Sequence, residues 1–410
     1  MKFSKKILFL LFLSFANVFA KSDKYRLTLK NNPATSIVIC WNQISGDNPR
    51  VLYSLHPLED NQKEYKFQKK PDRIVTYKGM NNHFARLENL QPNTNYYFVI
   101  VDSEGSSQRL WFQTAAADNR KISFVAGGDS RNNRKPRQEA NLLVSKLKPN
   151  AVLFGGDMTA RDTDEQWQQW FDDWQLTISE DGKITPIIVA RGNHEKSNTS
   201  IYNLFDTPSE KIYYAITYGK NLIRTYTLNT EISIKGDQTN WLKKDLKKHR
   251  SVLWKTAQYH KPMRPHVARK KEGYIHYAEW AKLFYNKKVR LVVECDAHTV
   301  KTTWPLKPTN SSSGEEGFVR EDKRGTVYVG EGCWGAPLRN ADDAKTWTRD
   351  SGKFNQVKWI FVDSKKIECR TILLKNIKEI NEVSNDARFE IPENLEIWTP
   401  SNGAVVTLKR

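Results

Sequence analysis

The sequence predicts a β-sandwich domain followed by a larger α/β domain. Short β-branched or aromatic runs, separated by turn residues, fill residues 24–115. From residue 122 onward, apolar strand-like runs alternate with amphipathic helical segments, which is the pattern of an α/β layered domain. The small polar segment Ala115–Asn119 lies between the two patterns. A chain of 410 residues also suits two domains better than one.

The first twenty residues have the pattern of a signal peptide. A lysine-rich start precedes the short apolar run Ile7–Phe15, and the small residues Val18 and Ala20 stand where a signal peptidase cleaves. We therefore expect cleavage after Ala20 and a secreted or periplasmic protein. The apolar run is short for a membrane span, although an uncleaved anchor is the alternative. No later segment is long and apolar enough to cross a membrane.

Residues 22–115 are expected to form the β-sandwich. Seven short strand-like runs in about 90 residues are typical of that architecture. Trp41, within one of these runs, is the expected core tryptophan. The expected strands are Leu27–Leu29, Ser36–Trp41, Arg50–Tyr53, Arg73–Tyr77, Phe84–Leu87, Tyr96–Val101 and Arg109–Thr114.

Residues 119–375 are expected to form the α/β domain, and residues 376–410 a polar C-terminal tail. The expected helices are Gln138–Leu147, Glu165–Trp174, Gln238–Lys248 and Tyr277–Tyr285. The expected strands are Ile122–Ala126, Ala151–Phe154, Ile184–Ala190, Tyr213–Tyr218, Leu222–Leu228, Val252–Tyr259, Val289–Glu294, Gly325–Val329, Gln356–Val362 and Lys366–Leu373.

The charge and cysteine content limit the class of protein. The formal net charge of +19 favours anionic partners such as phosphate esters, although a solvated basic surface without a partner explains it as well. No arginine-rich run or alternation of aromatic and basic residues indicates nucleic acid. Four cysteines are too few for a disulfide scaffold, and pairing of Cys333 with Cys369 is left open.

Metal-ligand types follow the ends of five predicted strands. Asp129 and Asp157 follow the first two, Asn193–Glu195 the third, His260 the fourth and Asp296–His298 the fifth. The carboxyl ends of strands in an open α/β sheet are where sites form. A single Gly-Asp pair or histidine is more often a turn or a packed residue, but five in this order make coincidence improbable.

Carboxylate, amide and imidazole groups together form a mixed oxygen and nitrogen ligand set. Such a set suits zinc, iron or manganese better than calcium or a thiolate site. Two cations that share one carboxylate lower the pKa of a bound water and hold phosphoryl oxygens. The pattern therefore predicts two divalent or trivalent metal ions, Fe, Zn or Mn, and a phosphoester substrate.

The order of these elements resembles that of the calcineurin-like metallophosphoesterases, with Gly192–Glu195 as its most specific part. The first domain resembles the fibronectin type III-like N-terminal domain of purple acid phosphatases. The residues behind that second resemblance are Asn32–Ser36, the Trp41 strand, Leu90–Tyr97 and Phe112–Thr114. Together the resemblances imply a β-sandwich followed by a four-layer αββα domain.

The family resemblance implies a role for each strand-end residue. Asp129 would bind the first metal and Asp157 both metals. Asn193 and His260 would bind the second metal, and His298 the first.

Two histidines are the candidates for contact with the substrate. His194 would bind a phosphate oxygen or protonate the leaving group. His266, shortly after His260, is a candidate for substrate contact or else an exposed loop histidine.

Three positions depart from the family pattern. Ala160 stands where purple acid phosphatases have a tyrosine ligand, so the tyrosinate–iron colour should be absent. Arg131 stands where many relatives have a histidine, and it is expected either to hold phosphate bidentately or to form a structural ion pair. Asp296 replaces the first histidine of the final Gly-His-x-His motif and is expected to bind the second metal as a carboxylate.

The expected function is an exported, acid phosphatase-like hydrolase in which hydroxide activated by two metals attacks phosphorus. A phosphodiesterase of the same fold is one alternative, and a non-catalytic binding protein for an anionic surface polymer is another.

Trp334 is either a stacking residue at the rim of the site or a packed core residue. The basic residues after His260 form either a mouth for an anionic substrate or a solvated loop. These basic residues are Lys261, Arg264, Arg269, Lys270 and Lys271. The sequence predicts no oligomeric state.

Overall fold

The computed structural model describes residues 21–58 and 62–410, so the predicted signal peptide lies outside the described residues. The elements of the N-terminal region come first. They are β1 (Ser22–Thr28), β2 (Ile37–Gln43), β3 (Arg50–Ser54), η1 (Gln62–Glu64), β4 (Phe67–Lys69), β5 (Arg73–Tyr77), β6 (Met80–Leu87), β7 (Asn95–Asp102), β8 (Gly105–Ser106) and β9 (Leu110–Gln113).

The remaining elements alternate between strands and helices. They are β10 (Ile122–Gly127), α1 (Arg134–Leu147), β11 (Ala151–Phe154), α2 (Asp164–Trp174), η2 (Gln175–Thr177), β12 (Pro186–Val189), α3 (Asn198–Phe205), β13 (Tyr214–Tyr218), β14 (Ile223–Thr227), α4 (Asp237–Lys248), β15 (Trp254–Gln258), α5 (Tyr274–His276), η3 (Tyr277–Ala281), α6 (Lys282–Lys287), β16 (Val289–Glu294), β17 (Val300–Thr303), β18 (Leu306–Pro308), β19 (Phe318–Arg320), β20 (Val327–Gly330), β21 (Thr348–Gly352), β22 (Gln356–Val362), β23 (Lys366–Leu373), η4 (Ile377–Glu379) and β24 (Val405–Lys409).

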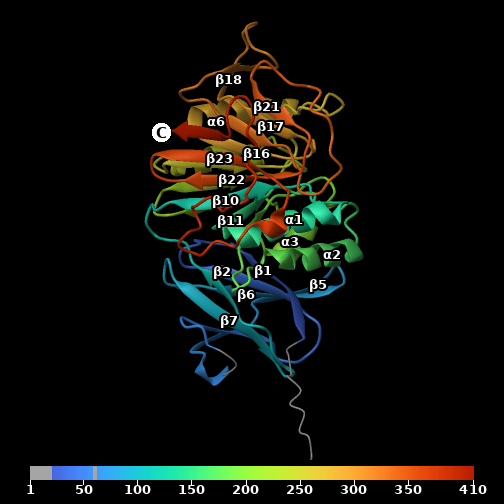
Figure 1. The fold of residues 1–410 in the computed structure, drawn as a ribbon, viewed down its shortest axis with the longest axis vertical. Coiled ribbons are helices and arrows are strands. Elements are labelled where there is room, and N and C mark those ends of the chain that lie inside the picture. The colour runs from blue at the N-terminus through green and yellow to red at the C-terminus, as the bar shows by residue number, and fades with distance from the viewer. Residues whose placement is uncertain (1–20, 59–61) are drawn as a thin grey trace, which may run out of the picture.

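Two large sheets organise the molecule. One has ten strands in the order β24-β23-β22-β10-β11-β12-β1-β2-β6-β5, and the other has seven in the order β13-β14-β15-β16-β20-β17-β21. Figure 1 shows the N-terminal strands β2, β6 and β7 at one end of the molecule and β16, β17 and β21 towards the other. Strands β10–β12 are mutually parallel, as are β14, β15, β16 and β20, so their carboxyl ends share an edge in each sheet.

The N-terminal strands form the predicted β-sandwich. The outer part of the ten-stranded sheet, β2-β6-β5, faces a second sheet in which β4, β3, β7 and β8 are neighbours and β9 pairs with β7. Trp41 is fully buried between them, together with Phe98 and Phe112. Its indole nitrogen donates a hydrogen bond to Gln43, which satisfies the polar end of this core side chain.

The two domains share one continuous sheet. Strand β1 of the sandwich runs parallel to β12 of the α/β domain, with Leu27 opposite Pro186 and Thr28 opposite Ile187. On its other side, β1 pairs antiparallel with β2. Strand β1 therefore belongs to both domains, and the junction between them is a ladder of backbone hydrogen bonds.

The α/β domain has the four layers that the family resemblance implies. The inner faces of both large sheets meet in one apolar core, where Phe124 and Val152 of the first sheet and Leu291 and Val327 of the second belong to the same cluster. Helices α1 and α2 cover the outer face of the first sheet. Helices α4 and α6 cover the outer face of the second, through side chains such as Leu242 of α4.

Helix α2 illustrates why the sequence folds locally as it does. The Thr163 side chain accepts a hydrogen bond from the Gln166 backbone N–H and caps the helix, and acidic residues occupy the first turn. Trp167, Trp170 and Trp174 recur at helical spacing and are all buried against the sheet. The aromatic stripe that sequence periodicity detects is therefore the buried face of the helix.

Strand β24 and helix α3 are among the elements that the sequence pattern did not predict. Strand β24, within the polar C-terminal tail, pairs antiparallel with β23 and closes one edge of the ten-stranded sheet. Helix α3 follows the third strand-end motif directly. The domain boundaries proposed from the sequence stay predictions.

The remaining global features concern thiols, membrane spans and surface charge. All four cysteines are buried and free, including Cys333 and Cys369. No described helix has the length and apolar character that a membrane span requires.

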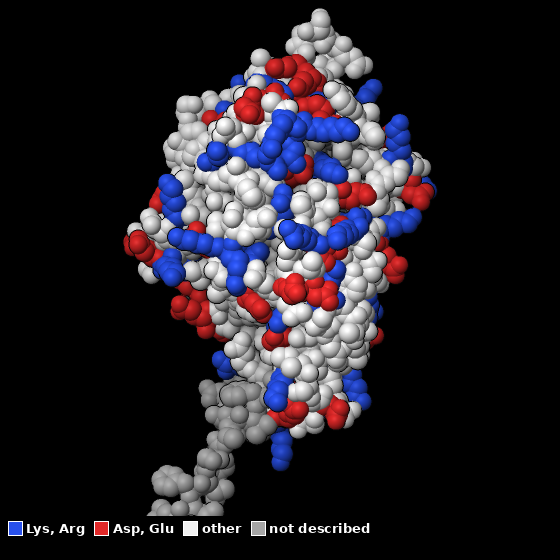
Figure 2. Space-filling model, turned by 90° about the vertical axis from the view of Figure 1, so that its right-hand side faces the viewer, with Lys and Arg blue, Asp and Glu red and all other residues white. Residues whose placement is uncertain are grey.

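Figure 2 shows, on the side that lies at the right in Figure 1, Lys and Arg gathered in elongated groups with Asp and Glu between them. The positive charge on this face is therefore distributed among patches.

Candidate metal centre

The loops after the parallel strands bring the predicted ligands together. Two groups of these predicted ligands have ligand atoms within 4.8 Å of one another: Asp129, Asp157 and His298 form one, and Asp157, His260 and Asp296 the other. Asp157 belongs to both groups. The shared carboxylate is the arrangement that two neighbouring metal ions need.

His298 faces Asp129 in the first group. Its Nδ1 lies 3.0 Å from the Pro337 carbonyl oxygen, which can only accept, so Nδ1 carries the proton. Its Nε2 lies 3.0 Å from Asp129 Oδ1, so the imidazole and the carboxylate could bind one cation together.

His260 is held in the same way in the second group. Its Nδ1 donates to the Gly155 carbonyl at 2.9 Å. Its Nε2 lies 3.1 Å from Asn193 Oδ1, 3.3 Å from Asp157 Oδ1 and 3.6 Å from Asp296 Oδ1. Burial alone would lower the pKa of His260, but the charges of Asp157 and Asp129 raise it well above its ordinary value. The position thus attracts a positive charge strongly.

Two buried carboxylate oxygens of the centre accept no hydrogen bond. Among the described residues, Asp129 Oδ1 and Asp157 Oδ2 are buried side-chain oxygens without a hydrogen-bond partner. Both residues are fully buried. Burial would raise the pKa of Asp157, but His260 and His194 lower it to about 2, so the carboxylate is ionised. Buried carboxylate oxygens and imidazole nitrogens are ligand types that bind metal ions, so the residues of this centre fit such ions.

The backbone at four candidate ligands adopts the left-handed region. The φ angles are +57° at Asp129, +56° at Asp157, +68° at Asp296 and +58° at His298. Such a conformation costs about 1–3 kcal/mol for a residue with a side chain, and it persists only where the surroundings impose it. Gly156, directly before Asp157, also has a positive φ of +94°. Strain at these positions is typical of functional sites.

Gly332 shows how closely the loops pack on the centre. Its φ is +74°, and a Cβ placed on it would lie 1.7 Å from Asp129 Oδ2. Only a glycine fits here, because any side chain would displace the carboxylate of a candidate ligand.

Glu195 supports the bridging residue, a role that the sequence did not reveal. It is fully buried, and its carboxylate accepts from the backbone N–H groups of Asp157, Met158 and Gly192 at 3.0, 2.7 and 2.8 Å. Burial and the charge of Asp157 raise the pKa of Glu195 to about 7. Its position in the Gly192–Glu195 motif was the available signal. This carboxylate fixes the loop and does not touch the open centre.

His194 lies at the accessible side of the centre. Its Nδ1 donates to the Ala160 carbonyl at 2.6 Å, and its Nε2 lies 3.7 Å from Asp157 Oδ2. Its side chain is 27% exposed, in contrast to the buried ligand histidines. Ala160, where the family has a tyrosine ligand, thus contributes only a carbonyl that orients this imidazole.

Arg131 reaches the first ligand group. Its Nε lies 3.3 Å from Asp157 Oδ2, and its Nη2 lies 3.3 Å from His298 Nε2. Its Nη1 donates to Asn132 at 2.8 Å. The sequence left open a substrate contact or an ion pair, and the structure places the guanidinium against the Asp157 carboxylate.

Asp296 has a cationic neighbour that the family pattern does not predict. Lys270 Nζ lies 2.7 Å from Asp296 Oδ1, so the residue that replaces the histidine is paired with a lysine. Arg339 donates to the Asp296 carbonyl at 3.0 Å and adds further positive charge. Lys270 belonged to the predicted basic mouth, whereas no sequence pattern singled out Arg339.

Lys261 and Arg264 of the predicted basic mouth are engaged elsewhere. Lys261 pairs with Glu231 at 2.7 Å, and Arg264 pairs with Glu272 at 3.3 Å. Arg269 and Lys271 are exposed. Lys270 is therefore the basic residue of this set that reaches the ligands.

His266 lies in a buried position away from the ligand groups. It is fully buried, and its Nε2 lies 2.7 Å from Thr348 Oγ1 while its backbone N–H donates to Glu331. Burial lowers its pKa well below the ordinary value, with Lys301 as the next cause. It is neither an exposed loop histidine nor a member of the centre, so its predicted substrate contact has no support in this geometry.

Two other residues near the centre are packing residues. Cys295 is fully buried, and its sulfur fills the space beside Gly128 and Gly155. Trp334 is also fully buried and donates to Asn141 Oδ1 at 2.9 Å. Its packed position agrees with the second of the two alternatives considered for it.

Comparison with known proteins agrees with the geometry. Residues 22–114 match the family model of the purple acid phosphatase N-terminal domain, and residues 132–301 match that of calcineurin-like phosphoesterases. The first region is therefore similar to a purple acid phosphatase N-terminal domain and the second to a calcineurin-like phosphoesterase domain. The matches confirm the predicted family and support a metal-dependent phosphoester hydrolase. No curated protein matches the chain in sequence.

Solved structures confirm the predicted fold class. Purple acid phosphatase PPD1 from yellow lupin (Lupinus luteus) seeds is similar, with a TM-score of 0.75 and 14% identity over 95% of this chain and 75% of that chain. PhoD is similar with a TM-score of 0.65 and 11% identity, over 88% of this chain and 87% of that chain. At these identities the likeness concerns the fold alone.

Proposed function

We propose that the protein hydrolyses phosphoesters at a centre that holds two metal ions. Asp129, Asp157 and His298 would hold one ion, and Asp157, Asn193, His260 and Asp296 the other. The supporting observation is the shared carboxylate of Asp157, which has buried carboxylate oxygens and imidazole nitrogens on both sides of it. Metal ions bound there would neutralise phosphoryl oxygens and make a water molecule more acidic.

His194 is proposed to handle the proton of the leaving oxygen. The Ala160 carbonyl fixes the proton on Nδ1, so any second proton is held on Nε2, the atom on the side of the centre. A protonated Nε2 can donate to an alkoxide or phenoxide as it departs. The partial exposure of this ring leaves room for a substrate.

Arg131, Lys270 and Arg339 are proposed to bind the substrate's phosphate group. All three cations lie beside candidate ligands, and the guanidinium of Arg131 can present two N–H groups to a phosphate. They stabilise the negative charge that develops on the phosphoryl oxygens.

Metal analysis combined with hydrolysis assays tests the proposal. Protein reconstituted with manganese, iron or zinc is assayed on an aryl phosphomonoester and an aryl phosphodiester, and its metal content is measured. His260→Ala should lower activity at least about 100-fold, since loss of a ligand exceeds loss of an outer partner. His249→Ala, at the end of α4, is the matched control. Less than one metal per chain and no hydrolysis would favour the non-catalytic alternative, a protein that binds an anionic polymer.

A second test concerns Arg131. If it binds phosphate bidentately, Arg131→Lys should raise KM about tenfold at unchanged metal content, because an ammonium cannot replace the planar fork. If it serves only as a structural ion pair with Asp157, KM should stay constant while metal content or stability changes.

Export is a further part of this proposal. Strand β1 begins at Ser22, directly after the expected cleavage site, so removal of residues 1–20 would leave the described fold intact. N-terminal sequencing of the protein from its natural host should find Lys21 first. A mature chain that begins with the apolar run would contradict cleavage.

A further inference from the structure

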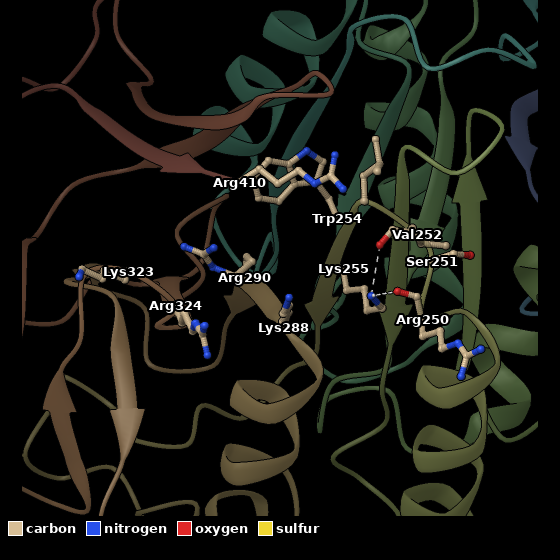
Figure 3. Close-up of a pocket in the computed structure, with 11 residues that line it drawn as sticks. Arg250, Ser251, Val252, Trp254, Lys255, Lys288, Arg290, Lys323, Arg324 and Arg410 are labelled. Carbon is tan, nitrogen blue, oxygen red and sulfur yellow. Dashed lines mark hydrogen bonds between the residues drawn. The ribbon is translucent and has the colours of Figure 1, made fainter.

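A pocket lined by basic residues lies at the end of the seven-stranded sheet that is opposite the candidate metal centre. It surrounds the starts of β15 and β16 and the turn before β20, and its volume is about 420 Å³. Figure 3 shows the Lys255 ammonium turned towards Val252 and Arg250, with Lys288 directly before the neighbouring strand and Arg290 and Arg410 on the side of the C-terminal strand. Seven of its lining residues are basic: Arg250, Lys255, Lys288, Arg290, Lys323, Arg324 and Arg410.

The pocket has more basic side chains than nearby carboxylates. Within residues 21–58 and 62–410, none of the seven basic side chains forms an ion pair with a carboxylate. Glu321 offsets part of this charge, because its carboxylate acts on Arg290, and it also accepts from the backbone N–H groups of Lys323 and Arg324. The lining contains no acidic residue.

Two of the cations are built into the protein. Lys255 is 4% exposed, and its ammonium donates to the carbonyls of Val252 at 3.2 Å and Arg250 at 3.5 Å. Arg290 is 9% exposed and donates to the carbonyls of Gly325 and Lys409. Carbonyls orient these groups but do not neutralise them. A buried cation without a counter-charge is costly, so an anion that supplies the charge gains binding energy.

The pocket is separate from the candidate metal centre. Lys288 precedes β16, whereas Cys295 and Asp296 follow it, and a six-residue strand spans about 20 Å. The two sites therefore occupy opposite ends of the same strands. A ligand in the pocket cannot touch the ligands of the metals.

We propose that this pocket binds a compact oligophosphate anion. Ammonium and guanidinium groups are the side chains that recognise phosphate, and arginine can do so through two parallel N–H bonds. The volume lies within the range of small-ligand pockets. Seven cations around one cavity favour a ligand that carries several phosphate groups over a single inorganic phosphate.

Calorimetric titration with tripolyphosphate tests the proposal in the full chain. The background is Asp157→Ala, so that hydrolysis at the metal centre does not consume the probe. Lys288→Gln with Arg324→Gln removes two exposed pocket cations and should weaken binding at least about tenfold, because each charge-assisted hydrogen bond contributes more than a kilocalorie. Lys70→Gln with Lys378→Gln removes the same charge from exposed positions elsewhere and should change affinity less than about twofold.

Two further titrations separate this pocket from other sources of binding. Adding Arg131→Gln to the background should leave the affinity unchanged, whereas a loss would place the probe at the metal centre and overturn the proposal. Citrate should bind more weakly than tripolyphosphate. Equal binding of citrate, or equal affinity of the pocket variant and the control variant, would also overturn it.

Discussion

Buried lysines at the two ends of the central strands differ in whether they have acidic partners. At the metal centre, Lys301 is buried with two acidic partners: its ammonium lies 2.6 Å from Glu294 and 2.5 Å from Glu331. At the opposite end, Lys255 is equally buried but contacts only backbone carbonyls. Burial lowers the pKa of both lysines. At Lys301 the two glutamates more than offset burial and raise the pKa, whereas at Lys255 the pKa stays lowered.

The contrast separates structural charges from charges available to a ligand. Lys301 belongs to a closed network that also includes the Arg264 carbonyl, so it supports the loops around the metal centre. Lys255 has Lys288 as a neighbouring charge, and this like charge lowers its pKa further. A cation that the protein does not neutralise is one that an external anion can neutralise.

The largest expected effect comes from breaking the network around Lys301. Lys301→Met leaves Glu294 and Glu331 buried without their cation, which should lower the free energy of unfolding by about 3–5 kcal/mol at neutral pH. Urea denaturation measures the change. Lys255→Met is the matched control and should be neutral or stabilising, because it removes a buried charge that has no partner. Equal losses in both variants would contradict the comparison.

The second effect concerns the loop that holds the bridging aspartate. Glu195→Gln places an amide where three backbone N–H groups need an acceptor, so it should weaken metal binding about 10- to 100-fold. Metal titration followed by activity measurement gives the apparent affinity. Activity should recover at high metal concentration, because Glu195 does not touch the substrate. Glu165→Gln, exposed in the first turn of α2, is the control, and a kcat defect that persists at saturating metal would refute a purely positioning role.

The smallest effect is the pH dependence of stability that Lys255 causes. Its folded pKa lies below the ordinary 10.5, so the unfolded chain binds more protons between those two values. Stability should therefore rise as pH increases through that window. Thermal unfolding of the wild type and Lys255→Met should show a difference that shrinks towards pH 10.5. A difference that is constant with pH would mean that Lys255 is not desolvated in solution.

The candidate ligands were predictable because each follows a buried parallel strand. Apolar runs located the strands, and the carboxyl ends of β10, β11 and β12 necessarily share an edge. His266 was misplaced by the same reasoning, because closeness in sequence to His260 does not fix the direction of a loop. Lys270 and Arg339 approach Asp296 from separate loops, and no local pattern records such a contact.

For a related reason, the sequence could not predict contacts between residues that are far apart in the chain. The basic pocket combines residues from the starts of β15 and β16, the turn before β20 and the end of the chain, which are distant in sequence. The pairing of β1 with β12 joins positions about 160 residues apart, and either strand alone resembles any buried strand. Propensity and periodicity describe the faces of a strand but not its neighbours.

The shared sheet has a consequence for how the protein can move and be divided. Because β1 is hydrogen-bonded to β12, the segment between the domains cannot act as a hinge unless that ladder breaks. A fragment that begins after the β-sandwich would expose the apolar edge of β12, and unpaired edges of this kind promote aggregation. The N-terminal domain is therefore held rigidly against the rest of the protein. Expression of the phosphoesterase domain alone should give insoluble protein.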